Sequence, residues 1–338
     1  MGNFGIHSKE QPMQMNLMIL SPGRRVEIVE YFKETFHKVG GFVYTLDMSP
    51  YAPALYAGDE FFCIKKDFSN LSTYIDDIVK ICVEKDVKAV LTLIDPELVL
   101  LSDYKDRFEK HGVKLILSDI EFIKETFDKF GFFNTYRKTI KLVDTVGSYE
   151  SAVEKLRSGE WKYPLFAKLR DGSASIGIKK IESENDFEVT KGNDKYIYQP
   201  FVKGDEYGVD AYFDMISGEL VSVFMKKKIA MRAGETDKAI SVKSDAVLAE
   251  VKKIANIKGL RGPIDIDVFV SEKNEVFVNE INPRFGGGHP HAYGCGVNFM
   301  QLILNNLQGV KNEPTFHNYK EGVLMLKYNG LLFRDTNA

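Results

Sequence analysis

Short apolar runs alternate with amphipathic segments over the first third of the chain. The run at 17–20 is followed by residues 24–36, where hydrophobic side chains recur with the spacing of one helix face. The alternation continues to residue 117. Expected strands are 17–20, 41–46, 89–94 and 113–117, and expected helices are 24–36, 74–82 and 99–110. Buried strands that alternate with helices predict a parallel sheet covered on both faces. We therefore expect a Rossmann-like α/β domain over residues 15–119.

The pattern changes after residue 119. Residues 120–159 have helical spacing, and Ser148 is the expected N-cap of a helix that runs to Leu156. Strands without intervening helices then follow, which predicts antiparallel sheets. The later elements are expected as strands at 164–169, 176–181, 196–201, 207–214 and 220–225, a helix at 246–255, a hairpin at 262–281 and a helix at 298–307. The predicted fold class is α/β followed by α+β, with the second domain at 120–338.

Composition is that of an ordinary globular protein. The 338 residues include 45 basic and 48 acidic side chains, a net charge of −3, and 44% are hydrophobic. This balance argues against nucleic-acid binding, and no apolar run approaches the roughly 18 residues that cross a bilayer. Cys63, Cys82 and Cys295 are far apart in the sequence, which favours a reducing, cytoplasmic location. Residues 1–14 are polar and are expected to form a disordered leader.

Two turns of the first domain resemble ligand sites to different degrees. The turn at 21–25 has only one of the three glycines of a dinucleotide fingerprint, so NAD binding is not expected. Asp95-Pro96-Glu97 follows a strand, at the edge where α/β sheets bind ligands. A proline beside acids is equally typical of a helix N-terminus. Both interpretations of this second turn stay open.

The hairpin at 262–281 carries acids on one face. Strand alternation puts Asp265 and Asp267 on one side and the isoleucines and valines between them on the other. A turn centred on 273–274 places Asp267 opposite Glu280 and Asp265 opposite Asn282. Facing carboxylates repel unless a cation lies between them, and oxygen donors of this kind suit Mg²⁺ or Mn²⁺ better than zinc. We expect a metal–phosphate site; an exposed acidic face is the weaker alternative.

A glycine- and serine-rich loop at 171–177 joins two expected strands. It lacks the Walker pattern and no helix follows it. Backbone N–H groups around Ser173 and Ser175 can still cover phosphates, and Lys168 adds a positive charge beside them. Loops of this composition are common at hairpin tips, so this loop indicates phosphate binding only in combination with the carboxylate hairpin.

Three further features are weaker. The lysine run at 226–228 and residues 231–236 lie between expected strands, and a charge run is typical of a solvated loop. The glycines at 286–288 suit either an anion site or a flexible turn. His289 and His291 have no nearby cysteine or third ligand, so a zinc site is not expected.

The motifs in this order resemble the ATP-grasp superfamily, and most of all one half of the carbamoyl-phosphate synthase large subunit. They are Lys129, the Lys168 strand with its loop, the segment 199–207, Asp267, and Glu-Ile-Asn-Pro-Arg at 280–284. The resemblance covers nearly the whole chain, including the Rossmann-like domain that precedes ATP-grasp domains, and the last motif is its most specific element. It implies a lid subdomain at about 160–203 and the cofactors ATP and Mg²⁺ (or Mn²⁺).

The resemblance also implies roles by position. Lys129 and Lys168 would bind phosphate, Val202 would pack on adenine, Glu206 would hold the ribose, and Arg232 would lie over the phosphates and acceptor. The implied catalytic residues are Arg284, Lys168 and Arg232; the implied cofactor-binding residues are Lys129, Lys168, Ser173, Ser175, Gln199, Phe201, Val202, Glu206, Asp267 and Glu280; the implied metal ligands are Asp267, Glu280 and Asn282. Two positions depart from the family, because Gln199 replaces an acid found in many relatives and Lys168 replaces an arginine frequent in carbamoyl-phosphate synthases.

The expected activity is that of an ATP- and Mg²⁺-dependent ligase. It would phosphorylate a carboxylate (or bicarbonate) to an acyl phosphate and couple it to an amine. The alternatives are a short carbamoyl-phosphate synthase-like form, with an amidotransferase partner, and a non-catalytic ATP-binding regulatory protein. The last is disfavoured because the metal ligands and Arg284 are present. Expected partners are small molecules and neither nucleic acid nor membrane, and an apolar edge of the first domain makes a homodimer reasonable.

Overall fold

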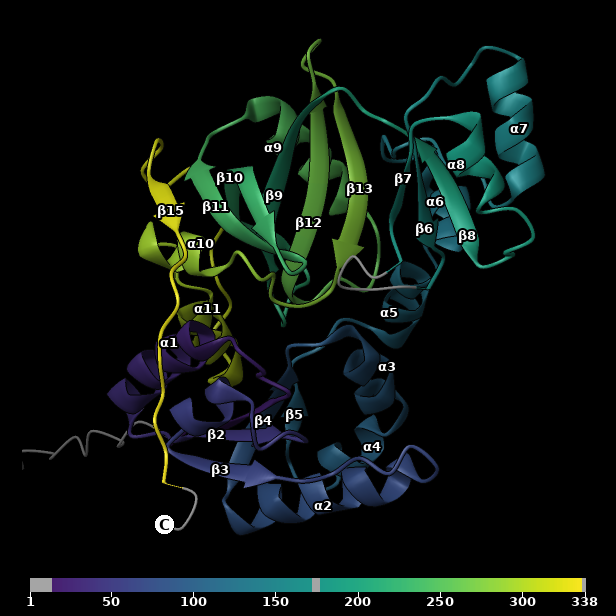
Figure 1. The fold of residues 1–338 in the computed structure, drawn as a ribbon. Coiled ribbons are helices and arrows are strands. Elements are labelled where there is room, and N and C mark those ends of the chain that lie inside the picture. Colours follow the sequence, from purple (N-terminus) through teal and green to yellow (C-terminus); the bar gives the residue numbers. More distant parts are fainter. Residues whose placement is uncertain (1–13, 172–176, 336–338) are drawn as a thin grey trace, which may run out of the picture.

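The computed structural model describes residues 14–171 and 177–335, and its first domain is built on a parallel sheet of order β3-β2-β1-β4-β5 (Figure 1). The predicted alternation of strands and helices is therefore confirmed. The expected helix at 99–110 is two helices, and the edge strand β3 was not predicted because it is short and mostly exposed. The elements are β1 (Asn16–Leu20), α1 (Val26–Phe36), η1 (His37–Val39), β2 (Val43–Asp47), η2 (Pro53–Ala57), β3 (Glu60–Cys63), α2 (Leu71–Glu84), β4 (Val87–Thr92), α3 (Asp95–Asp103), α4 (Lys105–Glu109) and β5 (Lys114–Leu115).

Strand β1 shows why this sheet is covered on both faces. Its side chains alternate, so Leu17 and Ile19 pack into the core that contains α1, while Met18 and Leu20 pack into the core that contains α2. All four are fully buried. Each contributes about 1.5–3 kcal/mol of hydrophobic free energy relative to an exposed side chain.

The second domain contains a seven-stranded sheet of order β13-β12-β9-β10-β11-β15, with the short β14 paired in parallel to β10. Helix α9 packs on one face of it. The acids of β12 and β13 lie on the other face, where they line a cavity. Strand β11 was not predicted; the turn at Ala233 and Gly234 returns the chain directly into it. The elements are β9 (Gly204–Phe213), β10 (Leu220–Arg232), β11 (Glu235–Ser241), α9 (Asp245–Ile254), β12 (Gly262–Ser271), β13 (Val276–Asn282), α10 (Pro290–Gly294), α11 (Phe299–Leu307), β14 (Thr315–Phe316) and β15 (Leu324–Leu326).

A smaller unit beside this sheet has its own three-stranded antiparallel sheet of order β7-β6-β8 (Figure 1). Its core includes residues of α7, so the unit extends before residue 160. Ser148 caps α7 as predicted, because its hydroxyl accepts a hydrogen bond from the amide of Ser151 at 3.2 Å. The elements here and in the connection are α5 (Ile120–Phe127), α6 (Lys129–Tyr136), α7 (Tyr149–Arg157), β6 (Leu165–Leu169), β7 (Lys179–Ile181), α8 (Glu184–Glu188) and β8 (Tyr196–Pro200).

The two large domains share a hydrophobic core. Helix α11 packs beside α1, and Phe285 and Phe299 lie in the same buried cluster as Ile28 and Phe32. The ring of Phe32 meets that of Phe285 edge-on, with centroids 5.7 Å apart. The first domain is therefore fixed against the end of the hairpin that carries the acids.

Asp214 anchors the loop that follows α11. This fully buried side chain accepts hydrogen bonds from Asn306 Nδ2 at 2.7 Å and from the amide of Asn312 at 2.9 Å. Burial opposes its ionised form, but these and other donors lower the pKa of Asp214 to about 2.

We expect Asp214→Asn to lower the free energy of unfolding at neutral pH by about 3 kcal/mol, because buried donors lose a charged acceptor. Urea denaturation measures this, with Asp77→Asn on the exposed side of α2 as the matched control. The stabilisation by a carboxylate with a lowered pKa is lost as the pH falls. The difference between wild type and variant should therefore shrink toward pH 2, and an unchanged midpoint at neutral pH would contradict the assignment.

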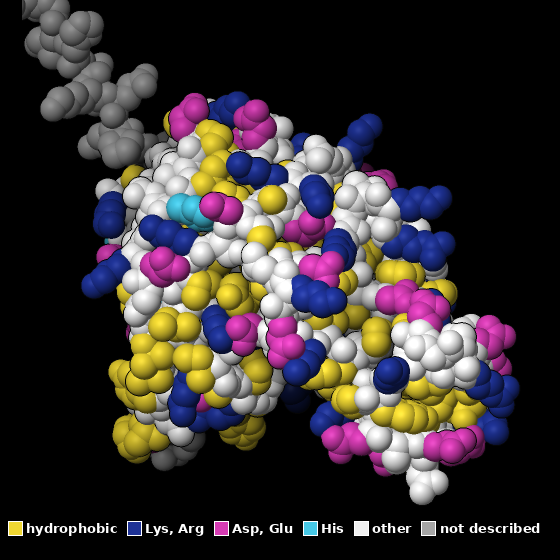
Figure 2. All heavy atoms as spheres, turned by 90° about the horizontal axis from the view of Figure 1, so that it is seen from above, with side chains coloured by type: hydrophobic (Ala, Val, Ile, Leu, Met, Phe, Trp, Pro, Cys, Tyr) yellow, Lys and Arg dark blue, Asp and Glu magenta, His cyan; other side chains and the backbone are white. Residues whose placement is uncertain are grey.

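No helix in the described ranges is long and apolar enough to cross a membrane. On the face seen from above in Figure 2, lysine and arginine side chains are interspersed with aspartate and glutamate, and no broad field of one sign is visible.

Candidate active site

The floor of the site is the β12–β13 hairpin. Asp267 pairs with Glu280 and Asp265 with Asn282, as predicted. Beyond Asp267 the pairing shifts by one residue, so that Val268 faces Val278. The predicted register therefore holds only at the end of the hairpin that carries the acids, and a β-bulge separates it from the turn.

The bulge brings a residue into the site that the alternation did not predict. Val278 and Ile281 both lie in the core beneath the sheet, while Asn279 and Glu280 both line the cavity above it. Asn279 Oδ1 accepts a hydrogen bond from Lys168 Nζ at 2.7 Å. The sequence signal was two adjacent polar residues within a strand that otherwise alternates.

A cavity of about 650 Å³ extends over this floor, between the small sheet, the large sheet and the first domain. One end has apolar and amide groups suited to a flat ring, the middle carries lysines and the acids, and the far end belongs to the first domain. Predicted site residues that line it are Lys129, Lys168, Gln199, Phe201, Val202, Glu206, Asp267, Glu280, Asn282 and Arg284. Gln199 Nε2 donates to Thr145 Oγ1 at 3.0 Å, which fixes the side-chain amide at the end of the cavity that suits a flat ring.

Two lysines stand where phosphate is expected. Lys129 Nζ lies 3.1 Å from Glu280 Oε1, and Lys168 reaches the same strand through Asn279. Burial lowers the pKa of Lys168, and the charge of Lys129 adds to the effect although Glu280 opposes it. Two close positive charges repel each other, and a bound polyanion relieves that repulsion.

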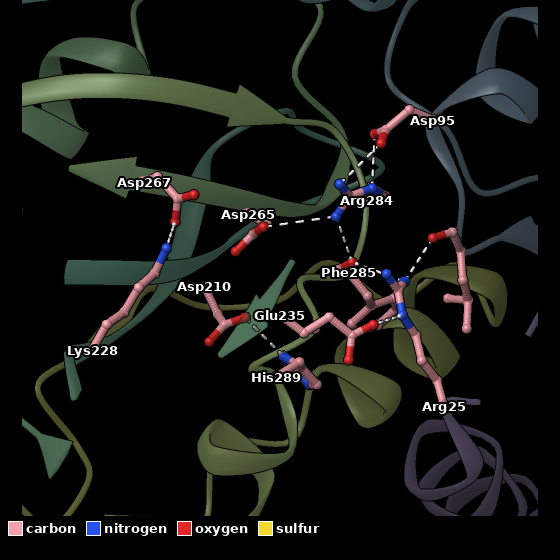
Figure 3. Close-up of polar contacts among 12 residues, drawn as sticks. Arg25, Asp95, Asp210, Lys228, Glu235, Asp265, Asp267, Arg284, Phe285 and His289 are labelled. Carbon is pink, nitrogen blue, oxygen red and sulfur yellow. Dashed lines mark hydrogen bonds and ion pairs between the residues drawn. The ribbon is translucent and has the colours of Figure 1, made fainter. Parts of the chain in front are cut away.

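The lysine run at 226–228 was wrongly predicted to be a solvated loop. It lies inside β10, where alternation turns Lys226 and Lys228 inward and Lys227 outward. Lys228 Nζ donates to Asp267 at 2.6 Å (Figure 3). It also donates to Glu206 at 2.7 Å. Burial opposes its charge, but these two acids raise the pKa of Lys228. Lys226 forms a buried ion pair with Asp210.

Arg284 and Asp95 join the two domains at the far end (Figure 3). Arg284 Nε and Nη2 donate to the two oxygens of Asp95 at 2.7 and 3.0 Å, and Nη1 lies 3.7 Å from Asp265. Burial opposes the charge, but Asp95 and Asp265 outweigh it and raise the pKa of Arg284. Asp95 begins α3 with proline in the first turn, and it also lines the cavity, so both interpretations of this turn describe it.

Asp265 completes the acidic group. Burial and the neighbouring Asp267 raise the pKa of Asp265 to about 7, and Arg284 only partly opposes them. Within the described residues no three His, Cys, Asp or Glu side chains form a ready metal site, and lysines pair with Asp267 and Glu280. The donor set still fits Mg²⁺, since two facing carboxylates and the amide of Asn282 offer hard oxygens on one face.

The glycines at 286–288 serve close packing. A Cβ atom on Gly286 would lie 2.3 Å from Asp265 Oδ1, one on Gly287 would lie 2.5 Å from Glu235 Cγ, and one on Gly288 would lie 2.6 Å from Lys226 Cε. The backbone therefore passes directly against buried charged groups, which neither earlier interpretation of this run predicted.

We expect Gly286→Ala to reduce turnover by about tenfold or more, because Asp265 must move away from its place beside Arg284. The matched control is Gly294→Ala, where a Cβ would meet nothing within 4 Å. Melting curves separate a local effect from unfolding. Equal activity of the two variants would show that the position of Asp265 is unimportant.

Two arginines of the first domain were not predicted as site residues. Arg25 Nη1 donates to the carbonyl of Leu93 at 2.6 Å, and Arg24 Nη2 donates to the carbonyl of Ala233 at 3.0 Å. Both lie within 3.5 Å of Glu235, which also pairs with Lys327 at 3.2 Å. Burial opposes the ionised form of Glu235, but these three cations lower its pKa. Their signal in the sequence, two arginines after a strand-end glycine, has meaning only once the domains are packed.

Other predicted residues lie elsewhere. Arg232 does not line the cavity; its Nε pairs with Asp237 at 3.1 Å, and its side chain is half exposed near the β10–β11 turn. Ser173 and Ser175 lie outside the described residues, as do residues 1–13 of the predicted leader. His289 Nδ1 lies 3.3 Å from Asp210 and His291 Nε2 lies 2.9 Å from the carbonyl of Val323.

A Rossmann-like domain fixed against two antiparallel sheets, with acids, lysines and an arginine around one cavity, defines the class of nucleotide-dependent ligase folds. Residues 128–288 match the family model described as ATP-grasp domain, and residues 17–116 match the one described as PylC-like, N-terminal domain. The chain is thus an ATP-grasp protein with a PylC-like N-terminal domain, and the predicted superfamily and fold class are confirmed. ATP-grasp enzymes use ATP and Mg²⁺. No curated protein matches the sequence.

Solved structures share the fold at low identity. N5-carboxyaminoimidazole synthetase from Staphylococcus aureus has a TM-score of 0.69 and 17% identity, over 90% of this chain and 80% of that one. The biotin carboxylase domain dimer of 2-oxoglutarate carboxylase from Hydrogenobacter thermophilus, in complex with MgADP and bicarbonate, has a TM-score of 0.70 and 15% identity. The match covers 91% of this chain and 73% of that one. L-amino acid ligase from Bacillus licheniformis has a TM-score of 0.62 and 18% identity, over 88% of this chain and 75% of that one.

Proposed function

We propose that this protein is an ATP- and Mg²⁺-dependent ligase that phosphorylates a carboxylate and couples the acyl phosphate to an amine. The observation that carries the proposal is the convergence of Asp267, Glu280, Asn282, two lysines and Arg284 on one cavity. The similar structures add support, because they are a synthetase in complex with ADP, a biotin carboxylase domain in complex with MgADP, and an amino acid ligase.

Each part of the cavity has a task in such a reaction. Phe201 and Val202 beside Gln199 suit the adenine ring, and Lys129 and Lys168 suit the phosphates. Asp267, Glu280 and Asn282 would hold Mg²⁺, which neutralises charge on the transferring phosphoryl group. Arg284, oriented by Asp95, stabilises negative charge on the oxygens of the acyl phosphate as it forms.

Lys228 pairs with Asp267 and Lys129 pairs with Glu280, so lysines balance the charge of the two acids. A cation held by these carboxylates would weaken both ion pairs. The charge of Lys129 acts on Lys168, so the two lysines together would attract a phosphate. Glu206, proposed to hold the ribose, is held by Lys228 in the same network.

Phosphate release from ATP tests the proposal. The purified protein is mixed with Mg²⁺, ATP, hydroxylamine as the amine, and a panel of carboxylic acids and amino acids. We expect at least one acid to stimulate phosphate release and to form its hydroxamate in equal amount. If no acid and no bicarbonate raises phosphate release above the ATP-only rate, the ligase function is wrong.

Bicarbonate is the second candidate acceptor. The similar biotin carboxylase domain was solved in complex with a bicarbonate anion, and that domain shares the fold. Stimulation by bicarbonate with ammonia, but by no organic acid, would favour the carbamoyl-phosphate synthase-like alternative. An amidotransferase partner belongs to that alternative alone. A homodimer stays a prediction, which sedimentation of the purified chain tests directly.

A further inference from the structure

The end of the cavity beyond Arg284 contains groups that a nucleotide does not need. Arg24 and Arg25 follow β1, and Leu93, Ile94 and Pro96 lie between β4 and the first turn of α3. In parallel sheets of this kind, such positions at the carboxyl ends of strands are where small ligands bind. Since the phosphate-binding lysines and the proposed metal ligands occupy the middle of the cavity, this end faces the acceptor of the phosphoryl group.

The guanidinium of Arg25 lies at this end of the cavity and has few anionic partners. Nη1 donates to the carbonyl of Leu93 at 2.6 Å and lies 3.5 Å from that of Phe285, and Nε lies 3.4 Å from Glu235 (Figure 3). Hydrogen bonds among the described residues leave Nη2 unused. Neutral carbonyls fix the guanidinium without cancelling its charge. Its ion-pair partner Glu235 is shared with Arg24 and Lys327, and Asp265 attracts it more weakly.

The local electrostatics agree with a surplus of positive charge. Burial and the charge of Arg284 lower the pKa of Arg25, even though Glu235 opposes them. The carbonyl of Phe285 accepts from both guanidiniums, at 3.5 Å from Arg25 Nη1 and 3.1 Å from Arg284 Nη1, and a bound anion would relieve the remaining repulsion. A carboxylate matches the planar donor edge of arginine in a bidentate arrangement.

The wall beside these arginines is apolar. Ile94 is half-buried and Pro96 is exposed, and both line the cavity next to Asp95. Bicarbonate has no carbon skeleton to place against such a surface, whereas an organic acid gains about 25 cal/mol for each Å² of apolar area that it buries there.

Building on the proposed ligase function, we propose that the acceptor is an organic carboxylic acid whose carboxylate binds between Arg25 and Arg284 and whose carbon skeleton lies against Ile94 and Pro96. Arg25 is then a substrate-binding residue contributed by the first domain, and it selects organic acids over bicarbonate.

The reaction balances with the groups named. A carboxylate oxygen attacks the γ-phosphorus, the new O–P bond forms, and the bond from that phosphorus to the β–γ bridging oxygen breaks, so ADP leaves. The amine nitrogen then attacks the acyl carbon, the C–O bond to phosphate breaks, and inorganic phosphate leaves. The nitrogen releases its surplus proton to solvent. The two arginines hold the acid during the first step and take no proton.

The test compares acetate, hexanoate, phenylacetate and bicarbonate as acceptors, with hydroxylamine as the amine. We expect wild type to prefer the larger acids. In Arg25→Met the KM for the preferred acid should rise by about tenfold or more, because a site built around a charged hydrogen bond loses it. The KM for ATP should stay nearly unchanged. Arg107→Met, which removes a surface guanidinium paired with Asp76, is the matched control.

A second variant protects the test against misfolding. Ile94→Ser keeps both arginines but removes apolar wall, and should lower the preference of hexanoate and phenylacetate over acetate. ADP binding by calorimetry shows that each variant is folded. An unchanged KM for the acid in Arg25→Met, or turnover with bicarbonate alone, overturns the inference while leaving the ligase function standing. A wild type inactive with every acceptor overturns both.

Discussion

Glu280→Gln is expected to reduce acyl-phosphate formation by about a hundred- to a thousandfold, as loss of a group that stabilises transition-state charge does. Glutamine keeps the size of the side chain but removes the charge that faces Asp267 and attracts Lys129 at 3.1 Å. A metal held by the remaining donors would lose one of its two carboxylates. Phosphate release and hydroxamate formation at saturating ATP and Mg²⁺ measure the effect.

The same hairpin supplies the control. Glu275 lies near the turn, half exposed, and pairs with Lys141 at 2.7 Å. Glu275→Gln therefore removes one carboxylate from the turn of the same hairpin without touching the cavity, and its activity should equal that of wild type. Similar rates for the two variants would mean that the acidic face is not the metal-binding face. Additional Mg²⁺ should restore part of the activity if weakened metal binding is the cause.

The face that carries Glu280 was predictable because a strand has a fixed period of two. Four polar residues at alternate positions, flanked by isoleucine and valine, admit only one assignment of inside and outside. The pairs Asp267 with Glu280 and Asp265 with Asn282 followed from that assignment, and the structure confirms both. Local geometry and burial were sufficient here, and no long-range contact had to be known.

The bulge at Asn279 shows where this reasoning ends. A bulge changes the period by one residue, and its position depends on how both neighbouring surfaces pack. In the sequence, the bulge is indicated by two adjacent polar residues in β13, Asn279 and Glu280. Lys226 and Lys228 are a similar case. A run of lysines normally faces water, but these two are buried against acids: Asp210 and Glu206 lie on the adjacent β9, and Asp267 lies on β12 beyond it.

The cavity-lining arginines of the first domain could not be predicted from the sequence, for another reason. Arg25 contacts Leu93 and Phe285, which are 68 and 260 positions away in the sequence. No local pattern specifies such partners. They follow from the shared core that fixes α1 against α11. The far end of the cavity is thus a product of domain packing, which a family motif does not describe.

Arg284→Met is expected to lower kcat by about a hundred- to a thousandfold while the KM for ATP changes little, because the guanidinium acts on charge that develops at the acceptor end. Asp95→Asn should cost only about tenfold. It leaves the positive charge in place but removes the carboxylate that fixes two of its donors at 2.7 and 3.0 Å. Steady-state kinetics of both variants measure the two effects.

The double variant decides how Asp95 acts. If its only task is to orient Arg284, then Asp95→Asn should have almost no further effect once Arg284 is methionine, and the two losses will not add. If Asp95 instead contacts the acceptor itself, the losses will multiply. The ion pair crosses from α3 of the first domain to the end of β13, and both side chains are mostly buried. A non-additive result would therefore show that the first domain acts on the phosphoryl transfer by aiming a residue of the ATP-grasp domain, and an additive one would overturn that role.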